Sequence, residues 1–241
     1  MGDISVAEAA RRLGVGVPRI HQRITDGSLR AVRVGSQWVI DEASLAPVAE
    51  SRAPGRPLSH RSAWALLALS QSDHRALDAL APAERSRARD RLHRLLMQSP
   101  PGVRPSEVEV QAAATLLRSW FRNRAERRLY RASPRDLPDL RDDDRLALSG
   151  LSHPRSGIAA GDLVEGYLAA EYVDSVVADH LLSAPAADRD ANVVLHIVAA
   201  APGPTAPLLL AADLAEHRRP REEARAAELL REIADNREPS A

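Results

Sequence analysis

The feature that most constrains the fold of this chain is a closely punctuated stretch over residues 4–45. Ser5 and Glu8, three positions apart, have the spacing of a helix-capping box, and Gly14 ends the helical apolar pattern that follows. A second helical pattern begins at Pro18, which the first turn of a helix tolerates, and ends at the next glycine. The stretch therefore predicts two short helices joined by a turn.

Two strands are predicted directly after these helices, over residues 29–34 and 37–40. Gly35 and Ser36 join them, and such a pair between two apolar runs is typical of a tight β-hairpin. Two short helices followed by a small β-ribbon are a layout typical of domains that bind DNA.

The second helical pattern has two faces. Val17, Ile20 and Ile24 repeat at helical spacing and are predicted to pack inward. The opposite face carries arginine and glutamine, which pair with guanine and adenine edges in the major groove, and arginine also holds phosphates. The predicted DNA contacts on this helix and on the ribbon are Arg19, His21, Gln22, Arg23, Arg30, Arg33, Ser36 and Gln37.

The same stretch resembles the excisionase and MerR type of winged helix-turn-helix. The matching positions are Glu8-Ala9-Ala10, Leu13-Gly14-Val15, Gly27, Leu29, Val32, Val34-Gly35 and Trp38. The resemblance implies a winged helix-turn-helix that binds double-stranded DNA. Gly16 and Pro18 depart from the family, because they stand where it has Ser or Thr to cap the recognition helix, so phosphate contacts from that cap are not implied. The alternative is a module of the same fold that docks a protein.

Composition bounds the rest of the molecule. At 241 residues with 44% apolar side chains, the chain is long enough for one large or two ordinary domains. The absence of Cys excludes disulfides, thiolate zinc sites and cysteine nucleophiles. No apolar run has membrane-spanning length, so we expect no membrane contact and a cytoplasmic location.

Charge is distributed unevenly, although the formal net charge is zero. Residues 1–51 carry 6 Arg against 6 Asp plus Glu, residues 52–135 carry 17 against 7, and residues 136–241 carry 10 against 20. A basic middle beside a DNA-binding module favours a wider nucleic-acid footprint, and an acidic end favours a basic protein partner. Equally, the two regions can hold helix faces that pair with each other inside one globule.

The predicted fold class is α+β, with four successive segments. These are a winged helix-turn-helix at residues 1–46, a linker at 47–58 that contains three prolines, an Arg-rich helical region at 59–135 and a C-terminal α/β domain at 136–241.

The last helix of the Arg-rich region is predicted over residues 106–129, with a capping box at Ser106 and Glu109. Arginines are interleaved there with Trp120 and Phe121, an arrangement that can grip a phosphate backbone. Core packing, with arginine stems lying along apolar side chains, fits the same residues. The additional phosphate contacts predicted here are Arg118, Arg122, Arg124, Arg127 and Arg128.

The C-terminal segment has a mixed α/β pattern. Strands are predicted over residues 162–168 and 192–198, the second being short and β-branched. A helix is predicted over residues 170–182, whereas residues 208–216 fit either a strand or a buried helix. An amphipathic helix is predicted over residues 220–234. We expect a small sheet covered by helices.

The sequence contains no recognisable catalytic motif. The eight His residues are scattered without His-x-x-x-His spacing, and a phosphate loop, a nucleophile elbow and a dinucleotide fingerprint are absent. Asp142, Asp143 and Asp144 are adjacent, but adjacent side chains do not converge on a cation, so a solvated turn is preferred. His196 is interpreted as a core or surface histidine. We therefore predict no catalytic residue, no metal and no cofactor.

The C-terminal half also resembles the C-terminal domain of abortive-infection (Abi) type IV antitoxins. The resemblance lies in the order of a Gly-Tyr strand, an Asn-Val-Val-Leu strand and an Asp-Leu-Ala-Glu segment before a Pro-Arg helix, at residues 164–168, 192–195 and 213–216. Those proteins are DNA-binding autoregulators encoded beside a nucleotidyltransferase toxin, so the resemblance implies a toxin partner. The N-terminal motif departs from that family, because it is closer to excisionase than to the family's usual winged helix.

The resulting hypothesis is a non-enzymatic, sequence-specific DNA-binding transcriptional regulator, in its most specific form a repressor of its own toxin-antitoxin operon. We expect a homo-oligomer or a protein partner held through the C-terminal half, since one small module buries little surface on DNA. One alternative is an excisionase-like factor that bends DNA. The other is a DNA-tethered domain that senses an effector or is an enzyme, which a ligand-sized pocket lined by His196 and carboxylates would favour.

Overall fold

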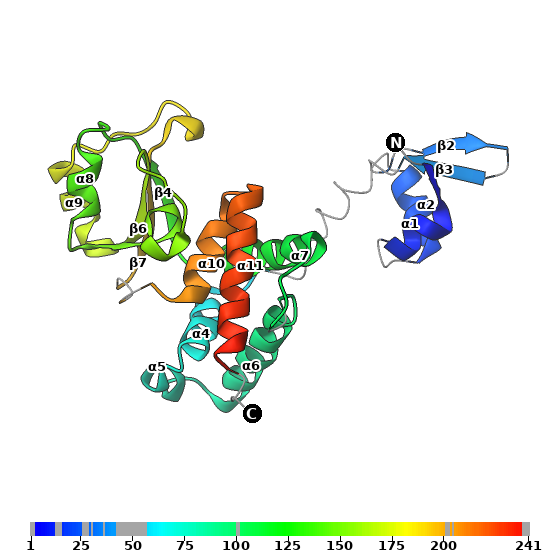
Figure 1. The fold of residues 1–241 in the computed structure, drawn as a ribbon, viewed down its shortest axis with the longest axis horizontal. Coiled ribbons are helices and arrows are strands. Elements are labelled where there is room, and N and C mark those ends of the chain that lie inside the picture. The colour runs from blue at the N-terminus through cyan, green and yellow to red at the C-terminus, as the bar shows by residue number, and fades with distance from the viewer. Residues whose placement is uncertain are drawn as a thin grey trace. The chain divides into compact units, whose positions relative to one another are not determined.

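The computed structural model describes residues 3–12, 16–25, 29, 31–35, 37–41, 57–99, 102–200, 203 and 205–237. They belong to two compact units, Met1–Gly55 and Arg56–Ala241 (Figure 1). The second unit contains both the predicted helical region and the predicted α/β domain. Residue 135 is not a domain boundary in the structure, because strands from both sides of it pair in one sheet.

The N-terminal unit combines two short helices with a small sheet. Its described elements are β1 (Asp3–Ser5), α1 (Val6–Arg12), α2 (Val17–Thr25), β2 (Ala31–Val34) and β3 (Gln37–Asp41). The strands form one antiparallel sheet in the order β1-β3-β2. The predicted helices and ribbon are confirmed. β1 goes beyond the prediction, because a strand of three residues is too short for its alternation to be recognised.

A small apolar core closes this unit. Its buried side chains are Ala9, Ala10, Ile20, Leu29 and Ile40. The Ser5 hydroxyl accepts a hydrogen bond from the Glu8 amide at 3.2 Å, as the capping-box spacing predicts. The prediction that Val17 packs inward is wrong: it is 42% exposed, because α2 begins there and the buried core reaches only to Ile20. Gly14, predicted to end the first helix, lies outside the described residues.

The second unit contains helices on both sides of a sheet. Its described helices are α4 (His60–Ser70), α5 (His74–Asp78), α6 (Pro82–Leu96), α7 (Glu107–Phe121), α8 (Leu137–Arg141), α9 (Val173–Asp179), α10 (Pro207–Glu216) and α11 (Pro220–Asp235). Its strands are β4 (Glu126–Tyr130), β5 (Leu146–Leu148), β6 (Val164–Ala169) and β7 (Val193–Val198). Short 3-10 turns are η2 (Gly150–Ser152), η3 (Pro154–Ser156), η4 (Ala170–Tyr172) and η5 (Asp188–Asp190).

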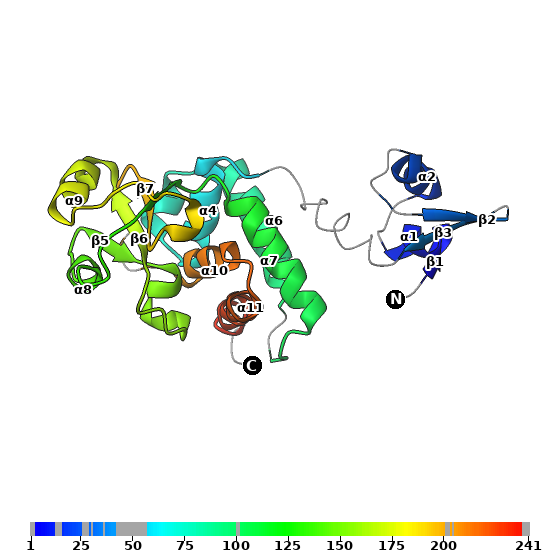
Figure 2. The same cartoon turned by 90° about the horizontal axis from the view of Figure 1, so that it is seen from above.

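The four strands form one sheet in the order β4-β7-β6-β5. β6 and β7 are parallel and are connected through α9, whereas β4 and β5 pair antiparallel at the two edges. α8 and α9 lie on one side of the sheet, and α10 lies on the other side (Figure 2). β6 and β7 are buried along their whole length, as expected for strands between two layers of helices.

α10 is the central helix of the larger core. It is buried on every side from Leu208 to Ala215, and it packs against α7 and α11. Of the two structures that fit residues 208–216, the buried helix is the one observed, as is typical of a helix that is apolar all round. α7 carries the predicted capping box, in which the Ser106 amide donates to the Glu109 carboxylate at 2.7 Å.

The prediction of one helix over residues 106–129 is wrong beyond Phe121. α7 ends at Phe121, and residues 126–130 form β4 instead. The local sequence is compatible with a helix, since Arg, Glu and Leu are good helix formers. Pairing with β7 overrides that preference, because β4 satisfies the backbone of an otherwise open strand edge and places Leu129 opposite Val194.

Candidate nucleic-acid interface and buried polar cluster

The exposed face of α2 carries the predicted base-contacting side chains. Ile20 is fully buried, which turns Arg19 and Gln22 toward solvent. The Arg19 guanidinium donates a hydrogen bond to the Gln22 side-chain oxygen, so the two groups are held together on the surface. His21 is also exposed, and Arg23 is half-buried. This face presents donors and acceptors of the kind that pair with base edges in the major groove.

The wing formed by β2 and β3 separates two of the predicted contacts. Arg33 pairs with Trp38 across the ribbon, and Val34 pairs with Gln37. Residues directly opposite each other share a face, and successive residues of a strand point to opposite faces. Arg33 and Gln37 therefore lie on opposite faces of the wing.

The tip of the wing is shaped by Gly35. Its φ of +63° is the left-handed conformation that this turn requires and that glycine adopts without strain. Val32 and Val34 are 69% and 62% exposed, so the wing surface is apolar as well as basic. Arg30 and Ser36, the other predicted contacts of the wing, lie outside the described residues.

The five arginines predicted to add phosphate contacts do not share one surface. Arg118 is ion-paired with Glu223 and donates to the Ala215 carbonyl at 3.2 Å. Arg124 is only 2% exposed. The prediction that these two arginines contact phosphate is wrong, because both are bound to groups inside the second unit. The three that reach solvent, for which phosphate contact stays a prediction, are Arg122, Arg127 and Arg128.

Arg124 lies at the centre of a buried polar cluster. Its Nε donates to the Tyr167 hydroxyl at 2.7 Å and to Asp213 Oδ1 at 2.9 Å, and its Nη2 donates to the same carboxylate oxygen at 2.5 Å. Its Nη1 donates to Glu216. The Ser149 hydroxyl donates to the other Asp213 oxygen. Two carboxylates thus neutralise a guanidinium that has almost no contact with water.

A second group of polar side chains adjoins the first through Tyr167. The Tyr167 ring stacks on the His196 ring, with the centroids 4.8 Å apart. The Glu165 carboxylate accepts hydrogen bonds from His196 Nε2 at 3.0 Å, from His217 Nε2 at 2.8 Å and from the Leu151 amide at 3.2 Å. Glu165 is 1% exposed, so these donors replace its hydration.

Opposing effects set the charges of Glu165 and His217. Burial by itself raises the pKa of Glu165, but the hydrogen bonds and charges of His196 and His217 hold that pKa well below its ordinary value. Burial by itself lowers the pKa of His217, but the hydrogen bond and charge of Glu165, with the charge of Glu222, raise that pKa above its ordinary value. The structure therefore favours a carboxylate next to an imidazolium.

Strand register explains why these side chains meet. Tyr167 of β6 lies opposite His196 of β7 in the parallel pair, and Glu165, two residues before Tyr167, shares its face. This face meets α10, where Asp213 accepts a hydrogen bond from the Tyr167 hydroxyl at 2.8 Å.

Only glycine fits at position 150, because a Cβ on Gly150 would lie 1.9 Å from the Glu165 carboxylate.

Sequence reasoning missed this cluster. It placed His196 in a strand, which is confirmed, without connecting this histidine to Glu165 and Tyr167. The pattern that could have revealed them is a set of ionisable residues inside two otherwise apolar strands, VEGYLA and VVLHIV. No local pattern connects Arg124 or Asp213 to these strands, since both lie on other elements.

Over the residues that the structure describes, no group of three or more His, Asp or Glu side chains is arranged to hold a metal ion. No described helix combines the length and the apolar composition that a membrane span needs.

The fold and surface of the N-terminal unit define a helix-turn-helix domain. Residues 4–53 match the family model described as a helix-turn-helix domain, which is of the excisionase-like type. The protein is thus a DNA-binding helix-turn-helix protein with a second, larger unit. No curated protein and no solved structure matches the chain.

Proposed function

We propose that the protein is a sequence-specific transcriptional regulator that represses its target operon. The observation that carries this proposal is the outward-facing pair of Arg19 and Gln22 on α2, within a helix-turn-helix domain. Arginine offers a two-donor fork to guanine and glutamine pairs with adenine, so this pair has the chemistry to distinguish base pairs. Arg33 on the wing adds a phosphate contact. Repression follows when the bound site overlaps a promoter.

The proposal gives the second unit a role in assembly. A single small module buries modest surface on DNA, so useful specificity normally requires a dimer or a second contact. The second unit, Arg56–Ala241, is large enough to supply self-association or to hold a protein partner. In this proposal the protein acts in the cytoplasm, without catalysis and without a cofactor.

Alanine substitution of the α2 face tests the proposal. Replacing Arg19, Gln22 and Arg23 together should abolish specific binding to the DNA upstream of the gene in a mobility-shift assay, because the base contacts are lost. Arg11→Ala is the matched control, since Arg11 is an exposed arginine of the same unit that lies on α1. It should keep the sequence preference. Undiminished binding by the triple variant would show that α2 is not the recognition helix.

Removal of the second unit tests the role in assembly. A fragment of residues 1–58 retains the separate apolar core of the N-terminal unit. It should bind the same DNA weakly, with affinity that falls steeply as salt rises, because only phosphate contacts and one set of base contacts remain. Full affinity of the fragment would show that the second unit takes no part in DNA binding.

The most specific form of the proposal is an autoregulating antitoxin. It is supported by the sequence resemblance of residues 164–168, 192–195 and 213–216 to Abi type IV antitoxins, and the partner would be a nucleotidyltransferase-like toxin. The neighbouring open reading frame provides the test. Co-purification of its product with this protein is expected, and a neighbourhood without any nucleotidyltransferase-like gene counts against this form.

An excisionase-like architectural role is the second candidate. The resemblance of residues 4–45 to excisionases favours it, because such factors act by bending DNA. A circular-permutation assay separates the two candidates: a strong bend at the bound site supports the architectural role, and an unbent site supports the regulator.

A further inference from the structure

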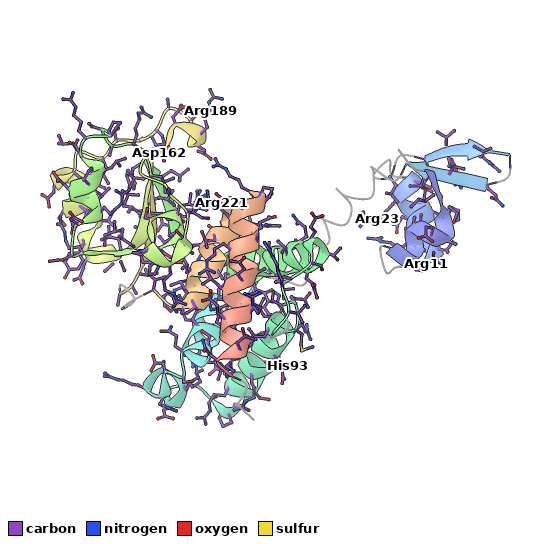
Figure 3. All side chains as sticks on the ribbon, viewed as in Figure 1. Arg11, Arg23, His93, Asp162, Arg189 and Arg221 are labelled. Carbon is purple, nitrogen blue, oxygen red and sulfur yellow. The ribbon has the colours of Figure 1, made fainter. Side chains whose placement is uncertain are left out.

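A cavity of about 640 Å³ lies at one end of the four-stranded sheet, next to the polar cluster. Its walls come from the segments that precede β6 and β7 and from the connection between α10 and α11. Figure 3 shows two of the lining residues, Asp162 and Arg189, at the same end of the unit. The volume is in the range of small-molecule sites in proteins.

Two neighbouring carboxylates at the start of α11 differ in their partners. Glu222 and Glu223 are both nearly buried, at 5% and 4% exposed. Glu223 is ion-paired with Arg118 and accepts a hydrogen bond from the Gln111 side chain at 2.8 Å. Glu222 lines the cavity, and over the described ranges no hydrogen bond or ion pair reaches its carboxylate. The helix dipole acts on both residues and does not account for the difference.

The Glu222 carboxylate is accessible only from the cavity. Its side chain is nearly buried and lines the cavity, and no protein donor occupies its oxygens in the described residues. A ligand in the cavity that carries N–H groups can therefore form hydrogen bonds with Glu222 without displacing a protein partner. A nearly buried acceptor without a protein donor in the wall of a cavity is the arrangement expected of a binding site in its empty state.

His217 adds a second polar group to the same wall. Its Nε2 is held by Glu165 at 2.8 Å, which leaves Nδ1 as the ring nitrogen that can face a ligand. Glu222 and His217 both line the cavity, so one ligand can contact both groups. The hydrogen bond to Glu165 thus fixes the orientation of the His217 ring.

Positive charge lies at the exposed part of the cavity. Arg131, Arg189 and Arg219 all line it. Arg131 donates to the Asp190 carbonyl at 2.8 Å, whereas Arg189 is 87% exposed and its nearest contact with Asp190 is 3.8 Å long. Asp162 also lines the cavity. Arginine is suited to hold carboxylate or phosphate groups at such a rim.

We propose that this cavity binds a small molecule that has an N–H-donating group at one end and a carboxylate or phosphate at the other. The donating end pairs with Glu222 and faces His217, and the anionic end reaches Arg189 and Arg219. Guanine nucleotides and arginine-like amino acids share this chemistry. The site lies wholly within the second unit, so its test does not depend on the proposed DNA binding.

A comparison of two variants tests the site without any ligand. Glu222→Gln keeps the shape of the side chain and removes its charge, and Glu223→Gln is the matched control. Thermal unfolding of full-length Glu222→Gln protein is expected close to the wild-type temperature, because no hydrogen bond or ion pair is lost and only the charge attraction to His217 is removed. Glu223→Gln should unfold at a lower temperature, because Arg118 loses its buried counter-charge. An equal fall for both variants would show that Glu222 is a structural group and would overturn the proposal.

Binding measurements with named probes test the ligand chemistry. Guanosine monophosphate and L-arginine represent the two sources of that chemistry, and guanosine and agmatine are their controls without the anionic group. Calorimetry on the full-length protein should show binding of at least one of the first pair, and weaker binding of its control. Glu222→Gln should weaken that binding at least about tenfold, through loss of a charge-assisted hydrogen bond.

Each outcome of the binding experiment either identifies the class of ligand or overturns the proposed site. Binding of the nucleotide alone or of the amino acid alone identifies the source. Failure of both probes to bind the wild-type protein, or equal affinity for the Glu222→Gln and wild-type proteins, overturns the proposal.

Discussion

Arg19 and Arg124 are the same residue type in helical-looking sequence, yet the two units use them in opposite ways. Arg19 lies on the exposed face of α2, and its partner Gln22 is three positions along the same helix. Arg124 is 2% exposed, and its partners Asp213 and Glu216 are 89 and 92 positions away along the chain. The exposed pair on α2 is held by a contact within one helix, whereas the buried cluster of the second unit depends on contacts between distant segments.

The same difference accounts for part of the charge split along the chain. The interpretation that the basic middle and the acidic end pair inside one globule is confirmed for four ion pairs between described residues: Arg118 with Glu223, Arg124 with both Asp213 and Glu216, and Arg127 with Glu216 at 4.0 Å. Other arginines of the middle segment stay on the surface, among them Arg87, Arg89 and Arg94 of α6. A count of arginines therefore does not distinguish a nucleic-acid surface from a buried ionic cluster.

The largest effect is expected from Arg124→Met. The substitution leaves Asp213 buried without its counter-charge, so it should lower the free energy of unfolding of the second unit by about 3–5 kcal/mol. Urea denaturation followed by tryptophan fluorescence measures this, because the Trp64 Nε1 donates to the Arg124 carbonyl at 2.9 Å and reports on the same region.

Adding Asp213→Asn to Arg124→Met provides the control. The double variant should recover part of the loss, because the unpaired buried charge is removed. A loss under about 1 kcal/mol in the single variant would place Arg124 with exposed arginines such as Arg19 and would break the contrast between the units.

A smaller effect is expected from pH, again in the second unit. The folded pKa of His217 is raised above its ordinary 6.5, so its stabilising contribution is complete below pH 6.5 and is lost as pH rises through the folded pKa. The folded pKa of Glu165 is lowered from its ordinary 4.5, so its contribution is present above pH 4.5 and is lost as pH falls through the lowered pKa. This pair therefore stabilises the unit most between pH 4.5 and 6.5.

His217→Gln isolates this contribution from other titrating groups. Between about pH 6 and about pH 9, the wild-type protein should lose more stability than the variant, because only the wild type loses the His217 imidazolium. Thermal unfolding at several pH values measures the difference. Parallel curves for the two proteins would contradict the prediction.

The next effect is expected in the N-terminal unit, where the Ser5 side chain caps α1 and its removal lowers the stability of that helix. Ser5→Ala removes the hydroxyl that accepts the Glu8 amide and should destabilise α1 by about 1 kcal/mol. Amide hydrogen exchange of α1 in the full-length protein measures this. Exchange of the α10 amides, which reports on the second unit, should stay unchanged. A simultaneous change there would show that the two units are not stabilised independently.

The smallest effect is expected on the wing. Arg33→Ala should weaken binding about equally on all DNA sequences and reduce the salt dependence of binding by about one phosphate contact, without an effect on folding. Gln37→Ala, on the opposite face of the wing, is the control and should leave the salt dependence unchanged. A change of sequence preference in Arg33→Ala would instead assign Arg33 to base contacts.

The sequence by itself determined most of the N-terminal unit. The Ser5 cap, the helix that begins near Pro18 and the hairpin at Gly35 could all be predicted, as could the outward face with Arg19 and Gln22. Each depends on residues within a few positions of one another, so the pattern that encodes it is local. In the second unit the same holds for β7 and for α11, which match strongly periodic segments.

Only the tertiary structure decided the rest of the second unit. Residues 126–130 became a strand because β7 offered an edge, and Arg124 became buried because α10 placed Asp213 beside it. The same packing gave Glu223 a partner and left Glu222 at a cavity wall. The physical reason is that a hydrogen bond or ion pair between distant segments leaves no periodic mark in either one, so the function of an arginine or a glutamate there depends on what folds against it.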